Sequence, residues 1–101
     1  MKQKMKASEH LSKARDLILN PDNWGQREFK SEDGKLCATG ALLTVDGGVD
    51  NHVSVETPAY RILGEVMQSP DAICNFNDTH THAEVIAKFD EAIALAISRG
   101  D

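Results

Sequence analysis

"NDTHTHAEVIAKF", residues 77–89, places two histidines, an aspartate and a glutamate directly ahead of an apolar run. Thr81 and Glu84 have the spacing of a capping box, in which the threonine hydroxyl accepts from the glutamate N–H and the glutamate side chain reaches back to the threonine N–H. Asn77 and Asp78 suit the turn before it, because their short side chains bond the local backbone. The stretch therefore predicts the start of a helix.

The helix that follows is predicted to cover residues 82–99 and to end before Gly100. Its apolar residues form a stripe wider than a single helix–helix contact needs. They are Val85, Ile86, Phe89, Ala92, Ile93, Ala96 and Ile97. We therefore expect this helix to cross the centre of the core.

Three more helices are predicted upstream. An apolar face with Ser8 as its N-cap predicts a first helix over residues 7–20. The apolar segment 37–45 ends at an Asp-Gly-Gly stop and predicts a short buried helix. Thr57 followed by Pro58 has the pattern of an N-cap and a first helical residue, so a further helix is expected to begin there.

Two shorter features complete the expected fold. The dipeptide Asp33-Gly34 is a turn former between short segments and predicts a small β-hairpin near 27–38, although the alternation of apolar residues is poor. Residues 69–71, Ser-Pro-Asp, predict a single helical turn. The predicted fold is mainly α, a compact bundle of about four helices with a small β-hairpin.

Composition bounds the class of protein. The 101 residues are 41% hydrophobic and 27% charged, which is typical of one globular domain, here spanning 1–101. No stretch approaches the roughly 20 apolar residues of a membrane span, and no export signal follows the basic first residues. Both cysteines are therefore expected to be reduced in the cytoplasm. The net charge of −5 disfavours nucleic acid binding, which needs a basic face.

The histidines do not have the spacing of a metal site. His80 and His82 lie two positions apart, whereas ligands on one helix face need a spacing of i,i+4, and no CxxC or HExxH pattern accompanies them. We expect no metal and no cofactor. His10 and His52 lie in a polar helix face and a polar loop, and both are expected to be solvated.

Cys37 and His82 are the candidates for catalysis, with Asn77 or Asp78 to orient the imidazole. A helix N-terminus close to Cys37 would favour the nucleophilic thiolate. However, no good N-cap precedes Cys37, and a cysteine between apolar neighbours is more often a small buried hydrophobe. Both interpretations stay open.

Candidate binding residues lie in two polar segments, 22–35 and 46–57. The first contains Trp24, the only tryptophan, which is expected to fold back onto the core and to join a binding surface only if it is exposed. The second contains Asp50 and His52, in a stretch predicted to be an exposed loop.

Several short motifs resemble one family. The pattern has a tryptophan and glycine (Trp24, Gly25), then DGxxCAxGAL (Asp33, Gly34, Cys37, Ala38, Gly40, Ala41, Leu42), YRxL (Tyr60, Arg61, Leu63) and a final NDxxxHAEVxxxFDxAI (Asn77, Asp78, His82 to Val85, Phe89, Asp90, Ala92, Ile93). The family often has tryptophan before the final motif, where this chain has Phe76. With these residues the chain resembles an uncharacterised family of small bacterial and bacteriophage proteins.

The resemblance implies a shared fold and a phage or mobile-element setting, but no activity. Small size, acidity and incomplete catalytic chemistry lead us to expect an accessory protein that binds a host protein, for example in a bacterial defence system such as CRISPR. One alternative is a small cysteine hydrolase or transferase that uses Cys37 and His82. Another is a protein that binds a small ligand such as a nucleotide, with backbone N–H groups at helix starts holding phosphate.

Overall fold

The computed structural model describes residues 6–27, 30–45, 57–68 and 72–101. The elements in chain order are α1 (Ala7–Ile18), the 3₁₀ helix η1 (Pro21–Asn23), α2 (Ala38–Val45), α3 (Pro58–Val66), α4 (Ala72–Thr79) and α5 (His82–Ser98). This part of the chain is mainly helical, as predicted, but it holds five α-helices where about four were expected. The additional helix is α4, expected as a single turn. It extends to two turns because Ile73 and Asn77, one turn apart, are both buried.

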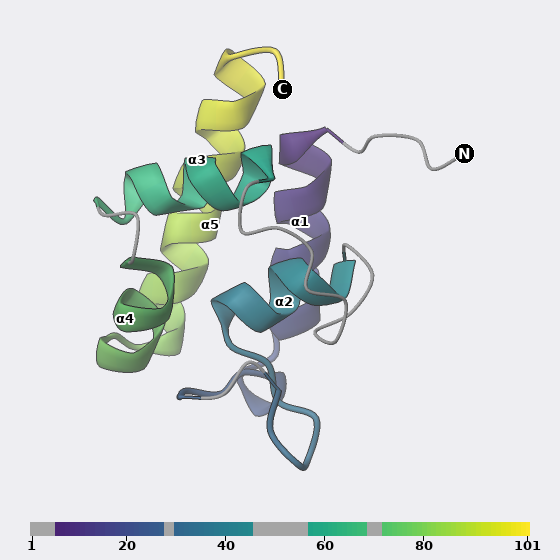
Figure 1. Ribbon diagram of the computed structural model, residues 1–101, viewed down its shortest axis with the longest axis vertical. Helices are drawn as coiled ribbons and strands as arrows, with labels where there is room; N and C mark the ends of the chain where they lie inside the picture. The colour runs from purple at the N-terminus through teal and green to yellow at the C-terminus, as the bar shows by residue number, and fades with distance from the viewer. Residues whose placement is uncertain (1–5, 28–29, 46–56, 69–71) are drawn as a thin grey trace.

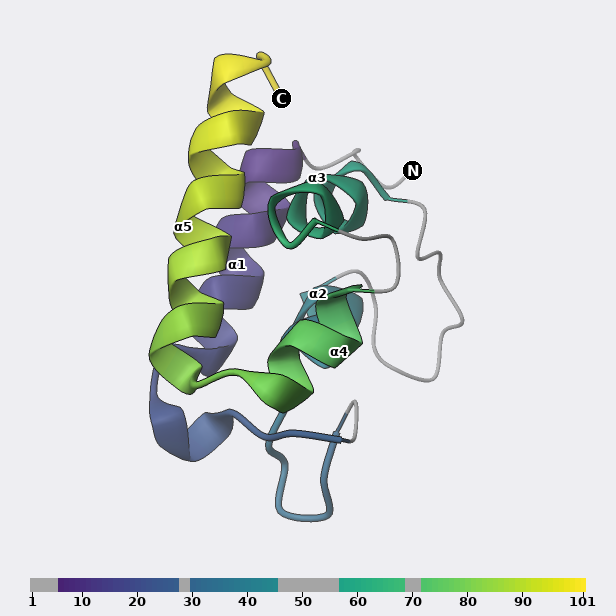
Figure 2. The ribbon, with the colours of Figure 1, turned by 90° about the vertical axis from the view of Figure 1, so that its left-hand side faces the viewer.

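The helices form two layers (Figures 1 and 2). α1 and α5 lie antiparallel along each other in one layer, and α2, α3 and α4 lie in the other. The antiparallel pairing follows from contacts at both ends: Ser8 N donates to Asp101 O over 2.9 Å, and His82 Nε2 lies 2.6 Å from Ile18 O. α1 also packs against α2 and α3, so it connects the layers.

The core lies between the two layers. α5 contributes Val85, Phe89, Ala92 and Ala96, all fully buried, as the apolar stripe predicted. Ile97, which belongs to the same predicted stripe, is 63% exposed, because the stripe is wider than the neighbouring helices cover. None of the helices within the described ranges has the length and apolarity needed to traverse a bilayer.

The prediction of a β-hairpin near 27–38 is wrong, because the described residues there form no pair of strands. Within residues 30–45 the chain makes a turn, with Gly34 N donating to Ser31 O and Gly34 at φ +87°. Leu36 forms two isolated bridges, parallel with Trp24 and antiparallel with Lys30, and no strand is formed in the described residues. The polar turn residues offer no apolar face to bury, so the pairing stops after single bridges.

The start of α1 also differs from the prediction. Ser8 is inside the helix, and Lys6, at the N-cap position, makes no side-chain cap. The cap comes from the far end of the sequence: Asp101 accepts from Ser8 N through its backbone oxygen and from Ala7 N through Oδ1, over 2.9 and 3.5 Å. α3 and α5 begin as predicted, with Thr57 as the N-cap of α3 and a complete capping box in α5.

The prediction that His10 is solvated is wrong. Its side chain is buried, with 6% of its surface exposed, and Nε2 donates to Leu42 O over 2.9 Å. His10 lies one turn before Ala14 and so shares the apolar side of α1. Leu42 O belongs to the last turn of α2, where carbonyls have no partner within the helix, so His10 satisfies one of them.

Candidate functional site

Asn77 is the most highly connected buried polar residue of the described chain. Its Oδ1 accepts from Trp24 Nε1 over 2.7 Å and from Ala38 N over 3.0 Å, and its Nδ2 donates to Gly25 O over 3.0 Å. The side chain has no exposed surface. One amide in α4 thus fixes the segment after η1 and supplies an N-terminal cap to α2.

The neighbouring residues extend this connection. Gln26 Nε2 donates to Asn77 O over 3.0 Å and to His80 O over 3.2 Å, and Arg27 N donates to Asp78 Oδ1 over 2.7 Å. Arg27 has a φ of 73°, a left-handed conformation that costs a residue with a Cβ about 1–2 kcal/mol. The carboxylate of Asp78 therefore holds the backbone in a conformation that it would seldom adopt alone.

We call this group of contacts the Asn77 junction; it consists of Trp24, Gly25, Gln26, Arg27, Ala38, Asn77 and Asp78. Sequence analysis identified Trp24, Asn77 and Asp78 as candidates, but for other roles. It missed Gln26 and Arg27, which make their bonds through a side-chain amide and a backbone N–H. Their position directly after Trp24-Gly25 was the only sequence feature that pointed to them.

Cys37 lies immediately before α2 and is buried, with 3% exposed. Its Sγ accepts from Gly40 N over 3.3 Å, so the sulfur helps to cap α2. Burial raises the pKa of the Cys37 thiol to about 11 from its ordinary value of 9.0, against the opposing effect of the Gly40 N–H. The thiol is therefore protonated at neutral pH. The second cysteine, Cys74, is half-buried, and both are free thiols.

His82 connects α5 to α1 and Trp24. Nε2 donates to Ile18 O over 2.6 Å, and the ring lies edge-on to Trp24 with 5.6 Å between centroids. We expected Asn77 or Asp78 to orient the His82 imidazole beside Cys37. The hydrogen bonds of these side chains go to other partners. Cys37 bonds Gly40 N, His82 bonds Ile18 O and Asn77 bonds Trp24.

His80 has a separate environment at the end of α4. Its ring stacks on Phe76 with 3.7 Å between centroids and an interplanar angle of 3°, and Nδ1 lies 3.0 Å from Phe76 O. Among the residues that the structure describes, no three His, Cys, Asp or Glu side chains are grouped to hold a metal ion. Asp50 and His52, the other proposed binding residues, lie outside the described residues.

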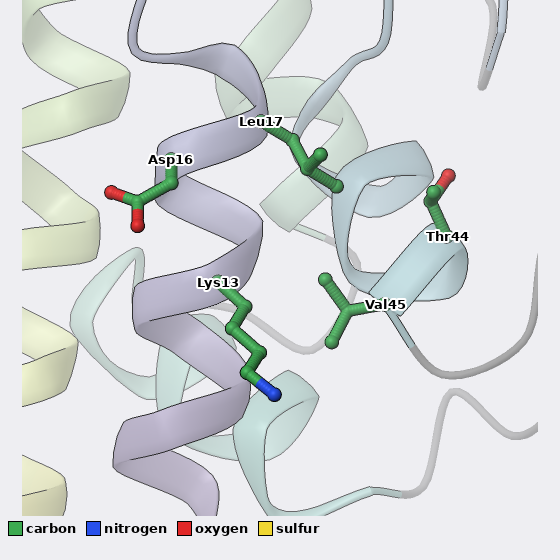
Figure 3. A pocket seen from close by; sticks show the side chains of 5 residues that line it. All are labelled: Lys13, Asp16, Leu17, Thr44 and Val45. Carbon is green, nitrogen blue, oxygen red and sulfur yellow. The ribbon is translucent and has the colours of Figure 1, made fainter.

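A shallow pocket of about 380 Å³ lies between α1 and α2, lined by Lys13, Asp16, Leu17, Thr44 and Val45 (Figure 3). Asp16 points away from Leu17 and Val45 in this view. A small-molecule site usually combines an apolar enclosure with a few converging polar groups. This pocket has neither, and we assign it no ligand.

The sequence matches the model of one protein family over most of its length. The model of a family of unknown function, DUF6197, matches residues 2–95. The chain belongs to this family. No curated protein and no solved structure matches it.

In this DUF6197 protein, the residues that carry the sequence resemblance have structural partners. Trp24, Gly25, Ala38, Asn77 and Asp78 meet in the Asn77 junction, although as many as 54 positions separate them in the sequence. The arrangement positions a loop and caps a helix. It presents no activated nucleophile.

Proposed function

We propose that this DUF6197 protein acts by binding another protein, and that its recognition element is the projecting loop, residues 22–27 and 30–36. Figures 1 and 2 show this part of the chain extending beyond the ends of the helices, away from the C-terminus. Binding residues are often found on loops that a rigid scaffold positions. The loop is therefore where we place the interface.

The observation that carries the proposal is the anchoring of this loop by the Asn77 junction. Trp24, Gly25, Gln26 and Arg27 are all bonded to the end of α4, and Leu36 N donates to Asn23 O at the other side of the loop base. A loop fixed before binding loses less conformational entropy when a partner docks. Within this segment Leu36 belongs to the core and Trp24 packs against it, which leaves the exposed residues between them available to a partner.

The exposed part of the loop offers contacts of both charge signs. Arg27 and Lys30 are basic, Asp22, Glu32 and Asp33 are acidic, and all five are exposed. A mixed pattern of this kind can match a complementary patch on a protein, whereas a phosphate backbone needs a basic surface. The loop chemistry therefore fits a protein partner.

The partner that we propose is a bacterial host protein in the cytoplasm, because the family resemblance implies a phage or mobile-element setting. A defence system such as CRISPR is one such setting. Asp50 and His52 belong to a second segment that could extend the interface.

The two alternative functions have less support. Catalysis by Cys37 would need a thiolate, and burial raises the pKa of this thiol to about 11. Phosphate binding would need free N–H groups at helix starts. Asp101 occupies that position in α1, Asn77 and Cys37 in α2, Thr57 in α3 and Thr81 in α5.

The test is capture from a bacterial host lysate with three forms of the tagged protein, followed by native mass spectrometry. The forms are the wild type, a loop variant Lys30→Ala/Glu32→Ala, and a control Glu9→Ala/Lys13→Ala. The control removes a charge of each sign from α1, where Glu9 and Lys13 form an exposed i,i+4 pair. Circular dichroism of each form would verify the helical fold.

We expect the wild type and the control to retain the same host protein in stoichiometric amount, and the loop variant to lose at least tenfold of it. A tenfold loss corresponds to about 1.4 kcal/mol, within the range of truncating a few interface side chains. A host protein retained equally by all three forms, or no host protein on any form, would overturn the assignment.

A further inference from the structure

The outer side of the α1–α5 layer carries apolar residues that the described helices leave exposed or cover only in part. In Figure 2, α5 and α1 lie at the left and α2, α3 and α4 lie on their right. Ile97 is 63% exposed and Leu19, just after α1, is 45% exposed. We call this surface the outer face; it comprises Leu19, Ala83, Ile86, Ala87, Ile93, Ala94 and Ile97, with Arg15 and Asp90.

The residues of α5 in the outer face fall on one side of the helix. At 100° per residue, positions 83, 86, 87, 90, 93, 94 and 97 occupy one sector of about 120°, apart from the buried Val85, Phe89 and Ala96. The three alanines are exposed and Ile86 and Ile93 are half-buried. The flank with Glu84 and Glu91 is polar, so the apolar sector is distinct from an ordinary solvated helix surface.

One ion pair stands in the middle of this surface. Arg15 Nε donates to Asp90 Oδ1 over 2.7 Å, joining α1 to α5. Asp90 is the only charged residue of the α5 sector, and Arg15 neutralises it. The outer face is thus apolar at both ends, and its charges gather at the centre, where Arg15 bonds Asp90 and also lies 4.0 Å from Asp16.

We propose that a second copy of this chain covers the outer face, with the α5 helices antiparallel and a two-fold axis passing beside Asp90. A two-fold contact requires a surface that complements itself. Ile86 and Ala94 lie equally far from Asp90 along α5, and so do Ile93 and Ala87, and Ile97 and Ala83. The axis therefore sets every isoleucine of one copy against an alanine of the other.

The charged residues of the outer face are also compatible with this two-fold axis. Two Arg15–Asp90 pairs meet at its centre, where each carboxylate can approach the guanidinium of the other copy. Opposite charges then alternate around the axis, and no unpaired charge is buried. An unrelated partner would need a matching large-and-small pattern by coincidence, whereas a second copy supplies it by symmetry.

The outer face is small compared with a standard protein–protein interface. With 1.5 Å of rise per residue and a helix width of about 10 Å, the outer face covers roughly 400 Å² per copy, about half of a standard interface. A contact of this size is smaller than a standard interface, so the dimer is expected to be weak and to depend on concentration.

Sedimentation equilibrium over a range of concentrations tests the proposal. The wild type is expected to rise from the chain mass of 11.1 kDa towards twice that mass as concentration increases. Ile97→Lys, a change at an exposed position, is expected to remain at the single-chain mass. Leu17→Lys is the matched control, because Leu17 is another exposed leucine-sized residue, 37% exposed, on the side of α1 that faces α2.

A charge reversal separates loss of the contact from loss of the fold. Asp90→Arg removes both Arg15–Asp90 pairs and sets like charges against each other at the axis, which should abolish the dimer. The double variant Arg15→Glu/Asp90→Arg restores both pairs and should recover it. A wild type that stays at the single-chain mass at every concentration would overturn the proposal. So would a dimer that survives both Ile97→Lys and Asp90→Arg. Neither result depends on the loop or its partner.

Discussion

At the scale of single residues, burial decides the chemistry of Cys37. Its side chain is buried, and its sulfur accepts from Gly40 N at the start of α2. Helix N-termini usually favour a thiolate, but here the loss of solvation is the larger effect, and the pKa of Cys37 is raised to about 11. The same position in the sequence that suggested a nucleophile gives a protonated helix cap.

This raised pKa predicts a stability change in alkaline solution. The folded protein keeps the Cys37 proton up to about pH 11, whereas the unfolded chain loses it from about pH 9, so the free energy of unfolding falls as the pH rises between these values. One pH unit of difference is worth about 1.4 kcal/mol, so the contribution lost is on the order of 2 kcal/mol. Cys37→Ala lacks it.

Urea unfolding of wild type and Cys37→Ala at several pH values from about 8 to 11 measures this difference. The stability advantage of the wild type should shrink as the pH rises. Lysine and tyrosine titrate in both proteins and cancel in the comparison. Parallel stability curves would contradict the buried, protonated thiol.

At the scale of elements, helix ends are capped in two ways. α3 and α5 have local caps, Thr57 and the Thr81–Glu84 box, and hydrogen bonding from Thr81 lowers the pKa of Glu84. α1 and α2 have distant caps. Asp101 and His82 bond the two ends of α1, and Asn77 and His10 bond the two ends of α2.

Asn77→Ala tests the distant cap of α2. The change leaves Trp24 Nε1, Ala38 N and Gly25 O without their partner, and we expect the free energy of unfolding to fall by about 3 kcal/mol, since each unsatisfied buried group costs about 1–3 kcal/mol. Trp24 is the only tryptophan, so its fluorescence should also shift to longer wavelength as the loop base loosens.

Asn75→Ala is the control for this prediction. Asn75 lies two positions away in α4 and is exposed, so the same substitution should change stability by less than about 0.5 kcal/mol. Equal unfolding curves for the two variants would show that the Asn77 amide does not hold the junction.

The difference between local and distant helix caps explains how far the sequence could predict the fold. The starts of α3 and α5 were predictable because each cap lies within three residues of the N–H that it accepts from. Ser8 was the wrong cap for α1, and His10 seemed solvated, because their surroundings come from Asp101 and Leu42, far along the chain. Periodicity carries no information about such distant partners.

The candidate site also depends on partners that are distant in the sequence. That Trp24 folds onto the core is confirmed, and its single indole N–H required a partner. Nothing in the spacing identified that partner as Asn77, 53 positions away. Asn77 and Asp78 also suit a local turn, and only the three-dimensional arrangement shows that they hold the segment that begins at Trp24.

At the scale of the whole molecule, the layers are held by the core, with ion pairs at its edge. Phe89 is fully buried between the layers, whereas the pair of Arg99 and Glu65, 2.8 Å apart, joins α5 to α3 with both side chains about half exposed. Exposed pairs contribute about 0–1 kcal/mol, while a buried aromatic side chain contributes several times more.

We therefore expect Phe89→Ala to lower the free energy of unfolding by about 3–5 kcal/mol and Glu65→Gln by less than about 1 kcal/mol. Urea unfolding at low protein concentration measures both. Added salt should remove the small effect of Glu65→Gln and leave that of Phe89→Ala. A larger loss from Glu65→Gln than from Phe89→Ala would contradict a core-dominated fold.

The bond from Ser8 N to Asp101 O brings the start of α1 next to the end of α5, which makes the chain suitable for circular permutation. Because the start of α1 and the end of α5 adjoin, a short peptide could join residue 101 to residue 6, and new termini could open at the exposed turn of Asp33-Gly34. α1 and α5, now the most distant helices in sequence, would become neighbours. Their pairing would then close a short loop instead of nearly the whole chain, and such a circular permutant should fold faster than the natural order.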